Sequence, residues 1–195
     1  MKPSKLGMVI SVLGAFATTA AHAENGECRV EDKNKQIELC SIEIAKAPND
    51  RVKGIGYLYR CQAFDILGNY SAALGDCERA RDFLPEDGSV YNSIAIVHSN
   101  MGENSKAIAA SSQAIKLTPS NGTFYNVRSN SYCEIRETNA SVEDRLKAMR
   151  NGAFSAAQLQ QYLQDAGYYS GSIDGNFGSA SVNALERWTI DGCGN

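Results

Sequence analysis

The sequence has 195 residues, of which 43% are hydrophobic and 21% are charged, and its formal net charge is −3. This length predicts one domain or two small ones, and the composition is that of an ordinary globular protein. The acidic balance argues against nucleic-acid binding, which needs a basic surface to neutralise phosphates.

The first 23 residues have the pattern of a secretory signal peptide. Two lysines precede an apolar stretch over 6–17, and the sequence AHA, with small residues at both ends, stops at Ala23. The alternative is a membrane anchor, but the apolar stretch is short for a bilayer span. We therefore expect an exported protein, periplasmic or secreted, with no stable membrane insertion after cleavage behind Ala23. Its 17 basic and 22 acidic residues would then give a net charge of −5.

The cysteine pattern favours disulfides over a metal site. An even number of cysteines in an exported chain is typical of disulfides, whereas a zinc site needs closely spaced Cys and His ligands. No two cysteines here are closer than 12 residues, and His98 is the one histidine after Ala23. We expect no metal and no cofactor. Fifteen pairings are possible, and we favour neighbours in sequence: Cys28 with Cys40, Cys61 with Cys77, and Cys133 with Cys193.

An internal repeat with a period of 34 residues runs through the middle of the chain. Tyr57, Tyr91 and Tyr125 are spaced by this period. Four further pairs keep the same spacing: Gly68 with Gly102, Ala73 with Ala107, Ala80 with Ala114, and Pro85 with Pro119.

Each period predicts two antiparallel helices. In the first full unit, helix A covers 51–67, Gly68 makes the turn because glycine accepts a positive φ, and helix B covers 71–83 until Pro85 stops it. Tyr57 and the residues four and seven positions later form a packing face of helix A. The second unit repeats this arrangement.

These features resemble the tetratricopeptide repeat, whose consensus places an aromatic, Gly, Ala, Ala and Pro at these offsets. The resemblance is clearest over 54–87 and 88–121. A degenerate third unit over 122–150 lacks the turn glycine and the final proline. We therefore expect an all-α fold with helical-hairpin repeats, an α-solenoid, over 24–150.

Repeats of this family stack and leave a concave groove lined by helix A, which usually binds a protein or peptide. The chaperone-binding members clamp a carboxylate with Lys and Arg, and those cations are absent from this groove. The alternative is that the repeats are only a scaffold. The positions that we expect in the partner groove are Leu58, Gln62, Asn92, Ile96, Ser99, Asn126 and Asn130.

After residue 150 the pattern changes to a small helical module over 151–195. Ser155 is the predicted N-cap of one helix, and Ser179 is the predicted cap of the next. Between them, several glycines and the turn signal Asp174-Gly175 mark a compact loop. A calcium loop is excluded by spacing, because position 6 counted from Asp174 is Ser179 instead of glycine, and position 12 is not glutamate.

This segment resembles the small three-helix peptidoglycan-binding domain of bacterial cell-wall enzymes. The family's motif is present as Leu159-Gln160, Leu163, Ala166-Gly167-Tyr168, Gly171, Asp174-Gly175, Phe177-Gly178, Ser181, Ala184-Leu185 and Trp188-Thr189. Ser181 and Trp188-Thr189 depart from the usual Thr and Phe-Gln, and the last helix is short or missing. The resemblance implies a peptidoglycan-binding surface near the loop, for which we predict Tyr169, Asp174, Asn176 and Arg187.

No catalytic motif is present: there is no HExxH, GxSxG or Walker loop. A cysteine nucleophile would need a free thiol beside a histidine. We therefore expect a non-catalytic adaptor that binds peptidoglycan through its C-terminal module and an envelope protein or peptide through its groove. The alternatives are a secreted protein that engages a host or foreign target and a regulatory subunit of a cell-wall hydrolase.

Overall fold

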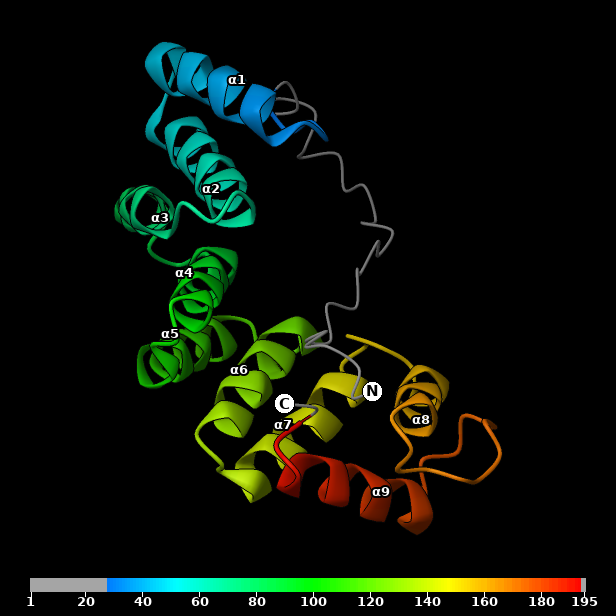
Figure 1. Cartoon of the computed structure of the whole chain (residues 1–195). Coiled ribbons are helices and arrows are strands. Elements are labelled where there is room, and N and C mark those ends of the chain that lie inside the picture. Colours follow the sequence, from blue (N-terminus) through cyan, green and yellow to red (C-terminus); the bar gives the residue numbers. More distant parts are fainter. Residues whose placement is uncertain (1–27, 194–195) are drawn as a thin grey trace. The chain divides into compact units, whose positions relative to one another are not determined.

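The computed structural model describes residues 28–193, so the predicted signal peptide and its cleavage site lie outside the described residues. Within 28–193 the chain forms α-helices and no strand (Figure 1). The all-α prediction is confirmed. The helices are α1 (Lys33–Lys46), α2 (Asp50–Ile66), α3 (Tyr70–Phe83), α4 (Gly88–Asn100), α5 (Asn104–Leu117), α6 (Gly122–Glu134), α7 (Thr138–Arg150), α8 (Ala156–Asp165) and α9 (Ser179–Ile190).

The described residues belong to two compact units, 28–118 with α1–α5 and 119–193 with α6–α9. In the first unit α2 pairs with α3 and α4 pairs with α5 as antiparallel hairpins (Figure 1). Both predicted turn glycines have the expected backbone conformation, with φ of +74° at Gly68 and +75° at Gly102. The predicted bounds of the first hairpin differ from those of α2 and α3 by at most one residue.

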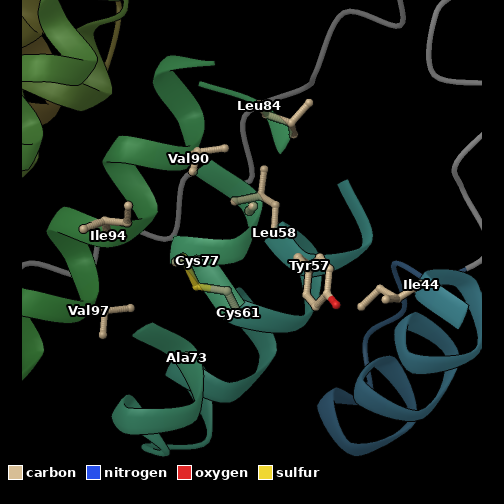
Figure 2. Packing of buried hydrophobic residues seen from close by; sticks show 11 residues of the cluster. Ile44, Tyr57, Leu58, Cys61, Ala73, Cys77, Leu84, Val90, Ile94 and Val97 are labelled. Atoms are coloured by element: carbon tan, nitrogen blue, oxygen red, sulfur yellow. A yellow bond between two sulfur atoms is a disulfide. The ribbon is translucent and has the colours of Figure 1, made fainter. Parts of the chain in front are cut away.

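The core of the first unit explains the repeat pattern. Tyr57, Leu58 and Cys61 of α2 pack against α3 and α4, and Ile44 of α1 joins the same cluster (Figure 2). The four alanines that recur at the 34-residue period are fully buried, so their small side chains allow the helices of each hairpin to approach closely: Ala73, Ala80, Ala107 and Ala114.

Close approach also depends on glycines at the start of helix A, which were not among the repeat positions noted from the sequence. Gly54, Gly88 and Gly122 are spaced by the repeat period, and all three are buried. A Cβ atom on Gly54 would lie 2.7 Å from Cγ of Leu84, and one on Gly122 would lie 2.5 Å from the carbonyl oxygen of Ala148. Glycine therefore lets the end of helix B cross the beginning of helix A.

The second unit begins with the degenerate repeat. Its two helices, α6 and α7, form the predicted hairpin although the turn glycine is missing. Arg136 occupies the turn position and adopts a φ of +61°, which is strained for a residue with a side chain. Helices α8 and α9 follow, and α9 packs against both α7 and α8.

The three disulfides of the structure join the pairs favoured from the sequence: Cys28–Cys40, Cys61–Cys77 and Cys133–Cys193. Cys61–Cys77 links the two helices of the first hairpin and is visible as the yellow bond in Figure 2. All six cysteines of the sequence are therefore paired. Among residues 28–193 no helix is both long and apolar enough to cross a membrane.

Candidate functional site

The C-terminal module is built from two helices and the loop between them. Helix α8 begins with a capping box, in which the Ser155 hydroxyl accepts from the Gln158 amide and the Gln158 side chain accepts from the Ser155 amide. This confirms Ser155 as the predicted N-cap. The helix ends at Asp165, and Gly167 follows the C-cap Ala166 with a φ of +83°. The long loop that follows leads to α9.

A buried glutamine organises this loop. Gln160 is 0% exposed, and its Oε1 accepts from the backbone amide of Gly175 at 2.9 Å. Its Nε2, with two hydrogens to donate, lies within hydrogen-bonding distance of four oxygens: Asp174 Oδ1 (3.0 Å), the Asn176 carbonyl (3.0 Å), Ser181 Oγ (3.2 Å) and Tyr169 Oη (3.4 Å). Because an unpaired amide would be costly at this depth, Gln160 fixes the path of the loop over α8.

Asp174 forms the turn of this loop. Its Oδ1 accepts from the backbone amide of Asn176 at 2.9 Å as well as from Gln160. These bonds favour the ionised form, so the Asn176 amide first, and Gln160 second, lower the pKa of the Asp174 carboxyl group. The carboxylate is exposed and negatively charged at neutral pH, and Gly175 takes the positive φ of +73° that the turn requires.

The predicted wall-binding residues fall into two classes. Asp174 and Asn176 are exposed, and the hydrogen bonds of Asn176 within the described residues are made by its backbone groups. Tyr169 and Arg187 are instead engaged within the module. The Tyr169 hydroxyl donates to the Ser172 carbonyl at 3.0 Å, and Arg187 Nη2 donates to the Tyr168 carbonyl at 2.7 Å. Arg187 is exposed as well, although its Nη2 is used by this bond, and Asp174 and Asn176 are the exposed members on the loop itself.

The prediction that Ser179 caps α9 is wrong. Gly178 occupies the N-cap position, no side-chain capping bond forms, and Ser179 is the first helical residue. The serine of α9 that contacts the loop network is Ser181, which is 1% exposed and accepts from Gln160. The family motif includes both Gln160 and Ser181, but sequence reasoning did not identify their contact.

Two of the predicted groove residues are buried. Leu58 is 6% exposed and belongs to the core of the first unit, so it offers almost no surface to a partner. Asn92, one repeat period later, is 8% exposed. Its Oδ1 has no hydrogen-bond partner among the described residues, although buried polar atoms are normally paired. This unsatisfied acceptor is itself buried, so Asn92, like Leu58, offers little surface to a partner.

The other predicted groove residues are half-buried: Gln62, Ile96, Ser99, Asn126 and Asn130. Gln62 Nε2 donates to Ser93 Oγ at 3.2 Å and links α2 to α4. Asn126 and Asn130 lie one turn apart on α6, and their Oδ1 atoms accept from Nη1 and Nη2 of Arg145 at 3.2 and 2.9 Å. This leaves the amide hydrogens of both asparagines as the donors that a ligand could meet.

His98 is largely buried and contacts a carboxylate close to it in sequence. Its Nδ1 lies 2.7 Å from Oε2 of Glu103, and its side chain is 12% exposed. Lys106 also donates to Glu103, at 2.9 Å. Within residues 28–193 no three His, Cys, Asp or Glu side chains are grouped so that they could hold a metal ion.

The geometry of the C-terminal module agrees with a known family. Residues 155–188 match the family described as "Putative peptidoglycan binding domain". The match begins at the capping serine of α8, includes the loop ordered by Gln160, and ends at Trp188 of α9. The predicted resemblance of the C-terminal segment to this family is therefore confirmed over 155–188.

The repeats also have a structural relative. The crystal structure of MamA, a tetratricopeptide repeat protein, is similar to this chain with a TM-score of 0.54 and 21% identity, over 61% of this chain and 68% of MamA. At this identity the likeness concerns the fold alone, and it confirms the tetratricopeptide-like fold. No curated protein sequence matches the chain.

Proposed function

We propose that the protein is a non-catalytic exported adaptor. Its C-terminal module binds peptidoglycan, and the groove of its repeats binds a protein or peptide of the cell envelope. The two parts would hold that partner at the cell wall.

The observation that carries wall binding is the family match over 155–188 together with the ordered loop. Gln160 donates to Asp174 Oδ1 and to the Asn176 carbonyl, so the Asp174 carboxylate and the backbone that carries Asn176 have fixed positions before any ligand arrives. Fixed donors and acceptors lower the entropic cost of binding a polar ligand. An amide and a carboxylate are suitable partners for the hydroxyl, amide and ammonium groups of glycan strands and stem peptides.

Partner binding is supported by the tetratricopeptide-like fold and by the polar groups of the groove. Asn126 and Asn130 are half-buried on α6, and their Oδ1 atoms accept from Arg145, which leaves their amide groups as donors. These donors can pair with the carbonyl groups of a peptide backbone. Export is supported by the pairing of all six cysteines, because disulfides persist in oxidising compartments.

Wall binding is tested by sedimentation of the purified mature chain with insoluble peptidoglycan. We expect the wild type to sediment. The Asn176→Ala variant should bind about two- to tenfold more weakly, the range expected for one lost hydrogen bond, because this exposed amide lies on the loop itself. Asn183→Ala is the matched control, since Asn183 is an exposed asparagine on α9 outside the loop. A wild-type protein that stays in the supernatant would rule out the wall-binding role.

Partner binding is tested by site-specific photo-crosslinking in the native envelope. A photoreactive residue at Asn130 should give a discrete crosslinked product. The same residue at the exposed position Lys116, outside the predicted groove, serves as the control. Equal products from both positions would remove the groove from the proposal.

A further inference from the structure

The segment that matches the peptidoglycan-binding family cannot bury its own apolar surface. Residues 155–188 contain only α8 and α9, and a chain of this length is normally too short to form a stable core without help. Nevertheless Leu159, Leu163 and Leu185 are 0% exposed and Trp188 is 2% exposed. Other parts of the chain must cover these side chains.

The degenerate repeat provides that cover. Val142 and Ala148 of α7 belong to the same buried cluster as the leucines of α8 and α9, and so does Phe154 from the connection before α8. The Cys133–Cys193 disulfide joins the end of α6 to the segment after α9. The core of the C-terminal module therefore includes residues of the last repeat.

Arg145 lies at the centre of this arrangement. It is 1% exposed, and its Cζ lies 5.0 Å from the centroid of the Trp188 ring, where cation–π attraction operates. The same guanidinium donates to Asn126 and Asn130 on α6. Trp188 in turn meets Tyr162 of α8 edge to face, with ring centroids 5.4 Å apart. One side chain of α7 thus connects α6 with α9, and through Trp188 with α8.

The repeat register shows that this arginine is specific to the last repeat. The equivalent positions one and two periods earlier are Ser111 and Cys77, which are small and fully buried. A guanidinium at such a depth is costly, and burial lowers the pKa of Arg145 to about 10. Two asparagine oxygens and an indole ring compensate part of that cost.

We propose that α6–α9 form one cooperative folding unit joined by Arg145. The last repeat then supplies part of the core of the peptidoglycan-binding module. Ligand binding at the loop then stabilises the surface of α6 that carries Asn126 and Asn130. This second step rests on the proposed wall binding, whereas the cooperativity of α6–α9 does not.

The first test is native-state hydrogen exchange on the oxidised mature chain without ligand. The slowest amides of α6 and α9 should exchange through the same opening, with equal dependence on denaturant. In Arg145→Met they should accelerate together, by about tenfold or more, because two hydrogen bonds and the cation–π contact are lost. Acceleration confined to α6–α7 or to α8–α9 would overturn the proposal.

Two further variants address a failure of Arg145→Met to fold and a non-specific effect of losing a buried arginine. If Arg145→Met does not fold, Arg145→Lys keeps the cation but loses the two-point contact with the asparagines, and it should still accelerate α6 and α9 by a common factor. Arg60→Met removes a half-buried arginine of the first unit and should leave the exchange of α9 unchanged. An equal effect of Arg60→Met on α9 would show that Arg145 has no special role.

The ligand step is tested with a soluble disaccharide-peptide fragment of peptidoglycan. At one hundred times its dissociation constant, exchange through the common opening should slow about 100-fold in both α6 and α9. Slowing in α8–α9 alone would contradict the linkage. Absence of any binding would remove the proposed wall-binding function, and the ligand-free experiment would still decide whether α6–α9 are cooperative.

Discussion

Arg60 and Asp76 form a two-point ion pair between the helices of the first hairpin, with Nε–Oδ2 and Nη2–Oδ1 distances of 2.6 and 2.9 Å. Hydrogen bonding to Asp76 raises the pKa of Arg60. Two repeat periods later, Arg128 and Asp144 form the same pair with the same distances. In the middle repeat the equivalent positions hold Ile94 and Ala110, which pack within the hydrophobic core. An ion pair and an apolar pair can thus both occupy this pair of equivalent positions in the repeat.

This alternation predicts the response of the first hairpin to substitution. Asp76→Ala should lower the free energy of unfolding by about 3 kcal/mol, because it leaves the half-buried guanidinium of Arg60 without its carboxylate. The double variant Arg60→Ile with Asp76→Ala copies the middle repeat and should recover at least half of that loss. Urea unfolding measures both values. A double variant less stable than Asp76→Ala would show that the apolar solution does not transfer between repeats.

Alanine substitutions at two helical glycines should change the stability of the protein in opposite directions. Gly122→Ala should destabilise the protein by about 2 kcal/mol or more, because its Cβ would meet backbone atoms that cannot rotate away: Ala148 O at 2.5 Å, and Ala153 N and Asn151 O at 2.8 Å. Gly75 lies inside α3, and a Cβ added there would have no other residue's atom within 4 Å beyond its own helix backbone and chain neighbours. Gly75→Ala should therefore stabilise the protein by about 0.5–1 kcal/mol through helix propensity. Thermal unfolding of both variants checks the two signs.

The buried glutamine of the C-terminal module predicts a large local effect. Gln160→Ala should cost about 2–4 kcal/mol, since it leaves the Gly175 amide and several loop oxygens without their partner. Gln161→Ala is the matched control. Gln161 is exposed and its side chain donates to the neighbouring Asp165, so its loss should change stability by less than about 0.5 kcal/mol. Similar unfolding curves for both variants would contradict the organising role of Gln160.

The lowered pKa of Asp174 predicts a pH dependence of loop order. Hydrogen bonds from the Asn176 amide and Gln160 stabilise the ionised carboxyl group in the folded state. Their contribution is therefore complete above the pKa of an aspartate in the unfolded chain, about 4, and it disappears as the pH falls through the lower folded-state value. The stability difference between wild type and Asp174→Asn should shrink as the pH is lowered through this window. A stability difference that stays constant between neutral and strongly acidic pH would contradict a role of the ionised Asp174 carboxylate in the turn.

The repeat architecture could be predicted because it depends on local, periodic requirements. Turn glycines, small residues at helix contacts and aromatic spacing all recur at 34 residues, and the structure contains the expected hairpins. Gly54, Gly88 and Gly122 carry the same period and could have been found in the same way. The positive φ of Arg136 could be inferred only from the register, because arginine gives no local signal for it.

The contacts that assemble the C-terminal module could not be predicted in this way. Arg145 looks like an ordinary surface residue of an amphipathic helix, yet it is buried under Trp188 of α9. Gln160 likewise reads as a solvated position of α8. In both cases the partner comes from a distant part of the sequence, and helical periodicity carries no information about which helix covers which face. The prediction that Leu58 lies in the groove failed for the same reason, since a helix A position can face either the groove or its own hairpin.

The three disulfides close three separate loops of the chain, and none of them links the first compact unit to the second. Cys28–Cys40 and Cys61–Cys77 lie in the first compact unit, and Cys133–Cys193 lies in the second. A single protease cut between Cys77 and Cys133 therefore separates two fragments even under oxidising conditions. A cut between Cys133 and Cys193 leaves the fragments joined until a reductant is added. Limited proteolysis at the connection between α5 and α6 can thus separate the part that contains residues 155–188 from the first compact unit without any disulfide being broken.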